Sequence, residues 1–149
     1  MSDNNESVET SSTDVQKEKR EPVKFDKETS VWKDPILETD DYLAYEDQFP
    51  VTQGHVLFVP KDDTFATLAS AFIAAYASGM NSVQAEGNEK AFTGFNLGMN
   101  VGSTAGQTVN WPHIHLIPRK EGDTEDPTGG VRNVIPGKGN YKENKWILG

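Results

Sequence analysis

The polar and apolar positions divide the chain into a polar first segment and a longer region with regular patterns. Residues 1–22 are rich in Ser, Thr, Asn and acidic residues, and their only apolar side chains after Met1 are Val8 and Val15. Such a segment buries too little surface to offset the entropy lost on ordering the chain. We therefore predict a disordered acidic tail over residues 1–22 and one folded domain over residues 23–149.

Four short runs in the second region have the composition of β-strands. They cover residues 42–46, 55–59, 93–99 and 113–117, and turn-forming residues lie between several of them. The second run is apolar on both faces apart from His55, which is typical of a central strand covered on both sides.

Between the second and third runs, apolar residues recur at helical spacing. The stripe consists of Phe65, Leu68, Ala69, Phe72, Ile73, Tyr76, Met80 and Val83. Asp63 is a suitable N-cap, and Gly79 predicts a bend or an end within the helix. The stripe is most simply explained by packing against a sheet. The element order predicts an α+β fold, an antiparallel meander with a helix packed on one face.

Composition narrows the possible partners. The chain has 149 residues, no internal repeats, no cysteine and a formal net charge of -9. One domain is expected, without a disulfide framework. The negative charge argues against broad binding to nucleic acid or to an anionic membrane. The polar, acidic beginning fits neither a secretory signal nor a transit peptide, so a soluble cytoplasmic protein is the default expectation.

Two of the three histidines lie close together, at about three quarters of the length of the chain. If the chain is extended there, Trp111, His113 and His115 share one face, because side chains two residues apart point to the same side of a strand. The preceding small-residue loop, residues 102–106, could present backbone N–H groups to an anion. The stretch is therefore a candidate anion site.

The histidine pair alone has three interpretations. It could be a half-buried structural pair, or a metal site with His55, His113 and His115 as ligands. It could also supply a nucleophile, since a neutral imidazole can attack phosphorus and form a covalent intermediate. The spacing of the histidines does not choose between them.

The residues around the pair carry a more specific signal. They read Gly106-Gln107-Thr108-Val109 before the pair and Leu116-Ile117-Pro118-Arg119 after it. This stretch resembles the signature of the histidine triad (HIT) family of nucleotide hydrolases and transferases. The register places Trp111 at the first triad position, His113 at the second and His115 at the third. The resemblance extends over roughly residues 42–141, and its last part is similar to bacterial diadenosine-tetraphosphate-type hydrolases.

The resemblance implies a role for each histidine of the pair. His113 falls on the family's nucleophile, which attacks the α-phosphorus, and His115 falls on the residue that contacts the phosphate. In the family, the backbone carbonyl at the first triad position accepts the proton on the far nitrogen of the nucleophile. Trp111 would still provide that carbonyl, although it removes an imidazole from the site.

The resemblance implies that four further residues contact the substrate and that one supports the triad. Asp47 falls on the acid that binds the ribose hydroxyls, and Asn100 on a polar residue of the phosphate pocket. Gln107 and Thr108 fall on residues that hydrogen-bond the phosphate or the leaving group. His55 falls on a supporting histidine beside the first triad position.

The leading hypothesis is a nucleotide phosphohydrolase or nucleotidyl transferase that acts at the α-phosphate through a nucleotidyl-histidine. Adenosine or another purine nucleotide is the implied substrate, with dinucleoside polyphosphates as candidates. The covalent step needs no metal or other cofactor, and the resemblance implies a homodimer. Because Trp111 replaces a triad histidine, the alternative is a nucleotide-binding protein with weak or no catalysis.

Overall fold

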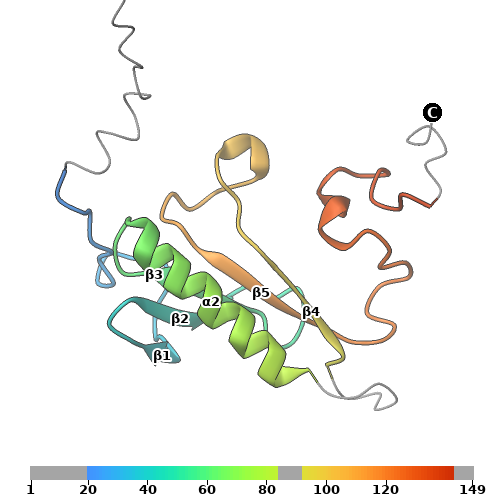
Figure 1. Cartoon of the computed structure of the whole chain (residues 1–149), viewed down its shortest axis with the longest axis horizontal. Coiled ribbons are helices and arrows are strands. Elements are labelled where there is room, and N and C mark those ends of the chain that lie inside the picture. Colours follow the sequence, from blue (N-terminus) through green and yellow to red (C-terminus); the bar gives the residue numbers. More distant parts are fainter. Residues whose placement is uncertain (1–19, 84–91, 143–149) are drawn as a thin grey trace, which may run out of the picture.

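Five antiparallel strands form a single sheet with one long helix against one face (Figure 1). The computed structural model describes residues 20–83 and 92–142. The elements are β1 (Leu37–Glu38), β2 (Tyr42–Glu46), β3 (Val56–Pro60), α2 (Phe65–Ser82), β4 (Gly94–Gly98), the short 3-10 helix η1 (Ser103–Ala105), β5 (Ile114–Arg119) and the 3-10 helix η2 (Gly130–Val134). The predicted α+β class, with its helix on one face of an antiparallel sheet, is confirmed.

The strands lie in the order β1-β2-β3-β5-β4, so the last strand of the chain inserts beside β3. The β2 bounds match the predicted run, whereas β5 begins at Ile114 rather than at residue 113. Pro112 has no N–H to donate to a ladder, so strand pairing starts after it. The short strand β1 was not predicted. In the register of β3 with β5, Leu57 lies opposite His115.

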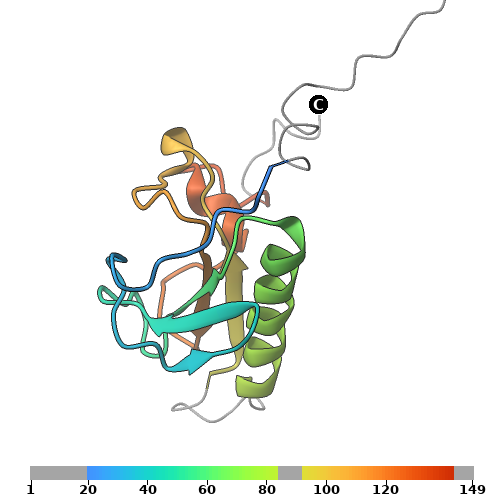
Figure 2. The same cartoon turned by 90° about the vertical axis from the view of Figure 1, so that its left-hand side faces the viewer.

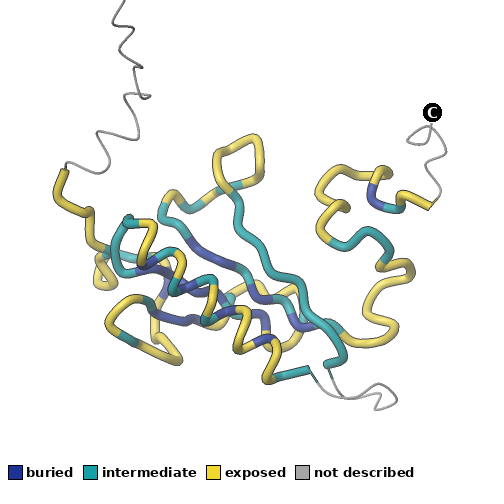
Figure 3. Tube along the Cα trace, in the orientation of Figure 1, coloured by how far each residue is buried: buried dark blue, intermediate teal, exposed yellow. Residues whose placement is uncertain are grey.

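Each face of the sheet carries its own apolar cluster. On the helix side, Phe58, Ile114 and Leu116 pack with Ala71 and Ala75 of α2. The other side is covered by the segment before β1, and its cluster consists of Trp32, Leu43, Tyr45, Leu57 and Val59. Figure 2 shows the helix and this segment on opposite sides of the sheet, and Figure 3 shows the buried residues concentrated along the strands and the inner face of α2.

The face of α2 that contacts the sheet differs from the prediction. The buried positions are Thr67, Ala71, Ala75 and Gly79, all small. The large residues of the predicted stripe are mostly exposed, including Phe65, Ile73, Tyr76 and Met80. Small side chains let the helix approach the sheet closely, and the larger ones are displaced to its flank. The expectation that this stripe is the core face was therefore wrong for most of its residues.

Two smaller expectations for α2 are also corrected. The N-cap is Thr64, whose hydroxyl accepts from the Thr67 N–H, whereas the Asp63 carboxylate accepts from the Val23 N–H. The helix continues through Gly79 without ending there. An added Cβ at Gly79 would lie 2.8 Å from the Phe95 ring, so this glycine serves the close packing of α2 on β4.

The segment before β1 is tied to the end of β3. The N–H of Phe25 donates to the Lys61 carbonyl at 2.8 Å, and the N–H of Asp63 donates to the Val23 carbonyl at 3.1 Å. These bonds hold the segment across the face of the sheet opposite α2. The predicted disordered tail lies outside the described residues except for residues 20–22, and residues 143–149 of the predicted domain lie outside them as well. Within the described ranges, no helix has the length and apolar character needed to cross a membrane.

Candidate functional site

A cavity of about 360 Å³ opens on the sheet face opposite α2. Its wall combines apolar residues with the polar residues predicted for the site. The lining residues are Val31, Trp32, Asp47, Gln48, Phe49, Leu57, Asn100, Gly106, Thr108, Val109, His113 and His115. The cavity thus gathers both neighbouring histidines and three of the four predicted substrate-binding residues.

His113 lies directly before β5 and is buried, with 7% of its surface exposed. Its Nδ1 is 2.8 Å from the carbonyl oxygen of Trp111. A carbonyl oxygen can only accept, so Nδ1 carries a proton and donates it to this carbonyl. This contact fixes the orientation of the ring, with Nε2 as the nitrogen on the side away from the Trp111 carbonyl. The backbone contact expected at residue 111 is therefore present with tryptophan at that position.

The Trp111 side chain points into the second apolar cluster. Its Nε1–H donates to the Pro60 carbonyl at 2.9 Å, and its ring centroid lies 5.5 Å from that of Phe25. It is not among the residues that line the cavity. The indole therefore has a packing role, while its backbone carbonyl contacts His113.

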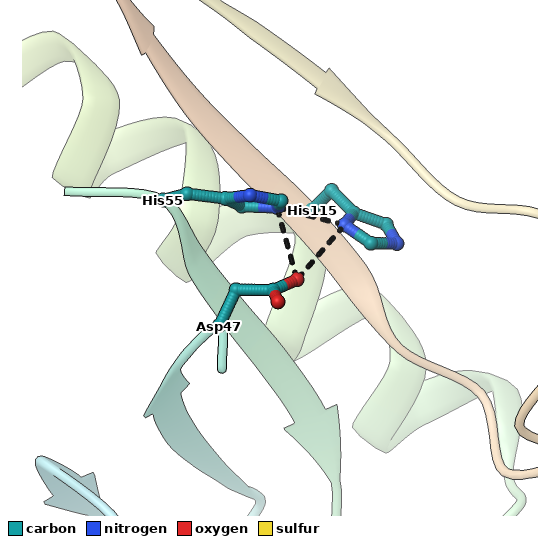
Figure 4. Close-up of side chains that lie close together, drawn as sticks. All are labelled: Asp47, His55 and His115. Atoms are coloured by element: carbon teal, nitrogen blue, oxygen red, sulfur yellow. Dashed lines mark hydrogen bonds and ion pairs between the residues drawn. The ribbon is translucent and has the colours of Figure 1, made fainter. Parts of the chain in front are cut away.

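His55, His115 and Asp47 form a compact polar group beside the cavity (Figure 4). His55 Nε2 lies 2.9 Å from His115 Nδ1 and 3.4 Å from Asp47 Oδ2. Asp47 Oδ2 is 4.0 Å from His115 Nδ1. We expected His55 beside the first triad position, but its ring contacts His115 at the third. The three atoms are close enough together to surround a metal ion, and this group differs from the predicted ligand set because it contains Asp47 instead of His113.

Burial keeps this histidine pair neutral. It lowers the pKa of His55, with the Asp47 carboxylate acting in the opposite direction. Burial also lowers the pKa of His115, and the neighbouring His113 and His55 lower it further against Asp47. Both imidazoles are therefore uncharged at neutral pH, because their pKa values fall below the ordinary value of about 6.5.

The small-residue loop at residues 102–106 uses several of its backbone N–H groups in internal hydrogen bonds. The N–H groups of Ala105 and Gln107 donate to the Gly102 carbonyl, and that of Gly106 donates to Ser103. The Gly102 N–H donates to the Gln107 side-chain oxygen at 2.8 Å. These four amides are thus used within the loop itself.

Both the oxygen and the nitrogen of the Gln107 side-chain amide form hydrogen bonds with backbone groups of the loop. Its nitrogen donates to the carbonyls of Val109 and Asn110, each at 3.0 Å. It does not line the cavity, whereas Thr108 and Asn100 do. Of these three predicted polar residues, only Thr108 and Asn100 line the cavity.

Asp47 combines a turn contact with a place in the cavity wall. Its Oδ1 accepts the Phe49 N–H at 2.8 Å, which closes a local turn, and its Oδ2 faces the histidines. Asp47 therefore closes a turn and also lines the cavity. A carboxylate still has lone pairs free after these contacts, so it can accept further hydrogen bonds from a ligand.

The apolar part of the wall was missed by sequence reasoning. Trp32 is 6% exposed, and its ring centroid lies 4.9 Å from that of His113. Val31 and Phe49 complete this side of the cavity and are exposed to solvent. No local motif marks these residues, because the segment that carries Trp32 is placed at the site by tertiary contacts, including its backbone bonds to the end of β3.

The fold and the cavity define an α+β protein with a pair of oriented histidines in an open pocket. A model described as HIT domain matches residues 28–122 of the chain. The chain is 35% identical over 102 residues to an uncharacterized HIT-like protein of Methanocaldococcus jannaschii, covering 66% of this chain and 79% of that protein. The chain belongs to the HIT domain family.

Two relatives are named as enzymes. Adenylylsulfatase HINT3 of Arabidopsis thaliana is 35% identical over 95 residues, which cover 59% of this chain and 46% of that protein. The asymmetrical bis(5'-nucleosyl)-tetraphosphatase of Schizosaccharomyces pombe is 36% identical over 89 residues, covering 54% of this chain and 46% of that enzyme. The family therefore includes hydrolases, and this chain matches less than half the length of each of these two.

Proposed function

We propose that this protein is a nucleotide hydrolase that cleaves between the α-phosphate and its leaving group through a covalent nucleotidyl-His113. The observation that supports this most directly is the 2.8 Å contact between His113 Nδ1 and the Trp111 carbonyl. With Nδ1–H donated to this carbonyl, the nitrogen left to react with a substrate is Nε2, and His113 lines a cavity large enough for part of a nucleotide.

The reaction has two steps that conserve atoms and charge. The Nε2 lone pair of His113 forms a bond to the α-phosphorus, while the bond from phosphorus to the leaving-group oxygen breaks and its electron pair leaves with that oxygen. The positive charge that develops on the ring is shared with the Trp111 carbonyl through Nδ1–H. The oxygen of a water molecule then forms a bond to the phosphorus and one water proton is released to solvent. The P–N bond breaks with its electron pair returning to Nε2, which gives a mononucleotide and the free imidazole.

The polar residues of the wall suit a nucleotide. Thr108, Asn100 and His115 offer neutral donors for the phosphate oxygens, and Asp47 offers acceptors for a ribose diol. We infer a purine mononucleotide as the common part of the substrates. The names of the two enzyme relatives suggest two leaving groups to test, a sulfate and a nucleoside polyphosphate.

The test is a panel of adenosine substrates, including diadenosine tetraphosphate and adenosine 5'-phosphosulfate, with the products separated by chromatography. Intact mass is measured after rapid quenching without acid, because phosphoramidate bonds to histidine are labile in acid. We expect release of AMP from at least one substrate and an adenylyl adduct that maps to His113. Binding by calorimetry without adduct or product would instead favour the alternative, a nucleotide-binding protein with a disabled triad.

We also propose that two copies of the chain pair along β4. This strand lies at the edge of the sheet, with β5 on one side only. Tyr76 and Met80 expose large apolar surfaces on α2, and the Tyr76 ring lies 6.0 Å from the Phe95 ring of β4. The 3-10 helix η2 lies against β4 and exposes Val131 and Val134. An open edge next to an apolar flank fits a twofold interface between identical chains.

This pairing predicts a specific effect of charge on one flank of α2. We expect Met80→Glu to shift the full chain from dimer to monomer in sedimentation and light-scattering measurements, because it buries a charge at the interface. Ser78→Glu is the matched control, since Ser78 is exposed on the flank facing Leu37 and Tyr42. A wild-type monomer at micromolar concentration, or dissociation by both variants alike, would contradict the proposed interface.

A further inference from the structure

We propose that residues 20–32 form a strap that opens and closes over one wall of the cavity, and that Trp111 holds it closed through its contact with Phe25. Trp111 does not line the cavity, so in this scheme its side chain is a positioning residue that acts on a bound nucleotide through the strap. The inference rests on the proposed function, because a nucleotide is the ligand whose affinity the strap would set.

The strap crosses the face of the sheet opposite α2 and is attached near both of its ends (Figure 2). In its first part, the N–H of Phe25 donates to the Lys61 carbonyl at 2.8 Å. At its other end, the Gln48 side-chain amide donates to the Val31 carbonyl at 3.1 Å. Between these two points, the packing of its side chains decides how firmly the strap stays closed.

A series of aromatic contacts links Trp111 to the cavity wall. The centroid of the Phe25 ring lies 5.5 Å from that of Trp111 and 6.1 Å from that of Trp32. The centroid of the Trp32 ring lies 4.9 Å from that of His113, which lines the cavity. Phe25 therefore contacts both indoles, and Trp32 extends the series to the cavity.

Trp111 belongs to the body of the domain rather than to the strap. Its Nε1–H donates at 2.9 Å to the carbonyl of Pro60, the last residue of β3. β3 lies inside the sheet, between β2 and β5. The contact between Phe25 and Trp111 thus joins the strap to a fixed part of the sheet.

One buried group under the strap favours the open state. The Tyr45 hydroxyl is buried, and it has no hydrogen-bond partner among the residues that the structure describes. The Tyr45 ring lies 6.1 Å from that of Trp32, between centroids. A buried hydroxyl without a partner has lost its hydrogen bonds to water, which costs free energy. Opening the strap returns water to this hydroxyl, so the anchor at Phe25 has an opposing contribution to overcome.

The closed strap completes the apolar wall of the cavity. Val31 and Trp32 belong to the strap, and both line the cavity. A nucleotide that binds only when this wall is in place loses apparent affinity in proportion to the fraction of molecules with an open strap. The His113 ring is oriented by the Trp111 carbonyl, which lies outside the strap. Opening should therefore change the nucleotide affinity and KM rather than kcat.

Amide hydrogen exchange in the full chain measures the strap without any ligand. The amides of Phe25 and Asp63 report on it, because they donate to the carbonyls of Lys61 and Val23. Relative to the amides of β3, we expect Phe25→Ala to accelerate their exchange by about five- to tenfold, since it removes the ring that contacts Trp111. Tyr45→Phe should slow their exchange by about fivefold, because the closed strap then buries no unpaired hydroxyl.

Affinity for AMP, measured by calorimetry, tests the link to the cavity. We expect Phe25→Ala to weaken AMP binding and to raise the KM of the best substrate by about three- to tenfold, with kcat within about twofold of wild type. Phe25→Leu keeps an apolar side chain and should restore most of the affinity. Adding Tyr45→Phe to Phe25→Ala should also restore it, because the opposing contribution is removed. A purely structural role would not let a second truncation recover binding.

Phe72→Ala is the matched control. Phe72 is also a half-buried phenylalanine, but it packs in the apolar cluster between α2 and the sheet. Its truncation should lower the free energy of unfolding while the AMP affinity and the relative exchange of the strap amides stay at wild-type values. Equal effects of Phe72→Ala and Phe25→Ala would show a general loss of stability and would overturn the anchoring role.

The outcomes distinguish this inference from the proposed function. Unchanged exchange of the strap amides in Phe25→Ala would overturn the inference alone, and so would faster exchange with unchanged AMP affinity. A fall in kcat at constant KM would also overturn it, because the effect would then be on the chemistry. A wild-type protein that binds no nucleotide would refute the proposed function and the role of the strap in binding together.

Discussion

His113→Asn is expected to form no nucleotidyl adduct and to lose turnover by about 10⁴-fold or more, the range seen when a covalent nucleophile is removed. The asparagine amide can keep a donor toward the Trp111 carbonyl, which His113 contacts at 2.8 Å. It has no lone pair that can attack phosphorus. Single-turnover assays with the best substrate of the panel, together with intact mass, measure both effects.

The control for His113→Asn is its affinity for nucleotide. Asp47, Asn100 and Thr108 line the cavity independently of the nucleophile, so the affinity for AMP measured by calorimetry should stay within a few-fold of wild type. An unchanged midpoint of thermal unfolding would show that the buried site is intact. Residual turnover within tenfold of wild type would refute His113 as the nucleophile.

Trp111→His is expected to destabilise the fold without raising the rate, even though it restores a histidine at the first triad position. The indole donates to the Pro60 carbonyl and packs against Phe25. Losing this packing and leaving a carbonyl without its partner should lower the free energy of unfolding by about 2–3 kcal/mol. Chemical denaturation measures this loss, and kcat measured well below the unfolding transition should stay close to wild type.

Trp111→Phe separates the contribution of ring packing to stability from that of the indole hydrogen bond. Phenylalanine can keep the ring contact with Phe25 but has no N–H for Pro60, so the expected loss is only about 1 kcal/mol. A tenfold gain in kcat for Trp111→His at unchanged stability would contradict this account. It would show that the missing imidazole, rather than any packing requirement, limits the reaction.

Local patterns were sufficient to predict most of the secondary structure. The run at Tyr42–Glu46 and the helical spacing after Asp63 depend on neighbours within a few residues, and both elements formed where expected. The order of the strands does not follow from such patterns. The pairing of β3 with β5 joins segments about 60 residues apart, and only tertiary packing selects it.

The prediction of which face of α2 packs on the sheet was wrong for a physical reason. Hydrophobic periodicity marks large apolar residues, whereas α2 approaches the sheet through Ala71, Ala75 and Gly79. Close approach depends on side-chain size, and Gly79 lies where a methyl group would collide with Phe95. The exposed Tyr76 and Met80 instead lie on the surface where we propose that a second copy of the chain binds.

The site was predictable where the motif is continuous and not where distant segments meet. The family resemblance of the stretch around His113 and His115 predicted the contact of His113 with the carbonyl of residue 111, and the cavity includes Asp47 as expected. Trp32 came from a segment whose position is set by backbone bonds to the end of β3, so no local signal identified it. The contact of His55 with His115 likewise depends on the register between β3 and β5.

The concentration of every imidazole of the chain in one place has a consequence for how the protein responds to acid. Histidine is the side chain whose unperturbed charge changes between about pH 5 and 8. All three histidines, His55, His113 and His115, belong to the cavity group. Since burial lowers the pKa of His55 and His115, the unfolded chain takes up these protons more readily, and acid favours unfolding below about pH 6.5. Mild acidification is therefore expected to lower the stability of the fold by protonating the histidines at the cavity.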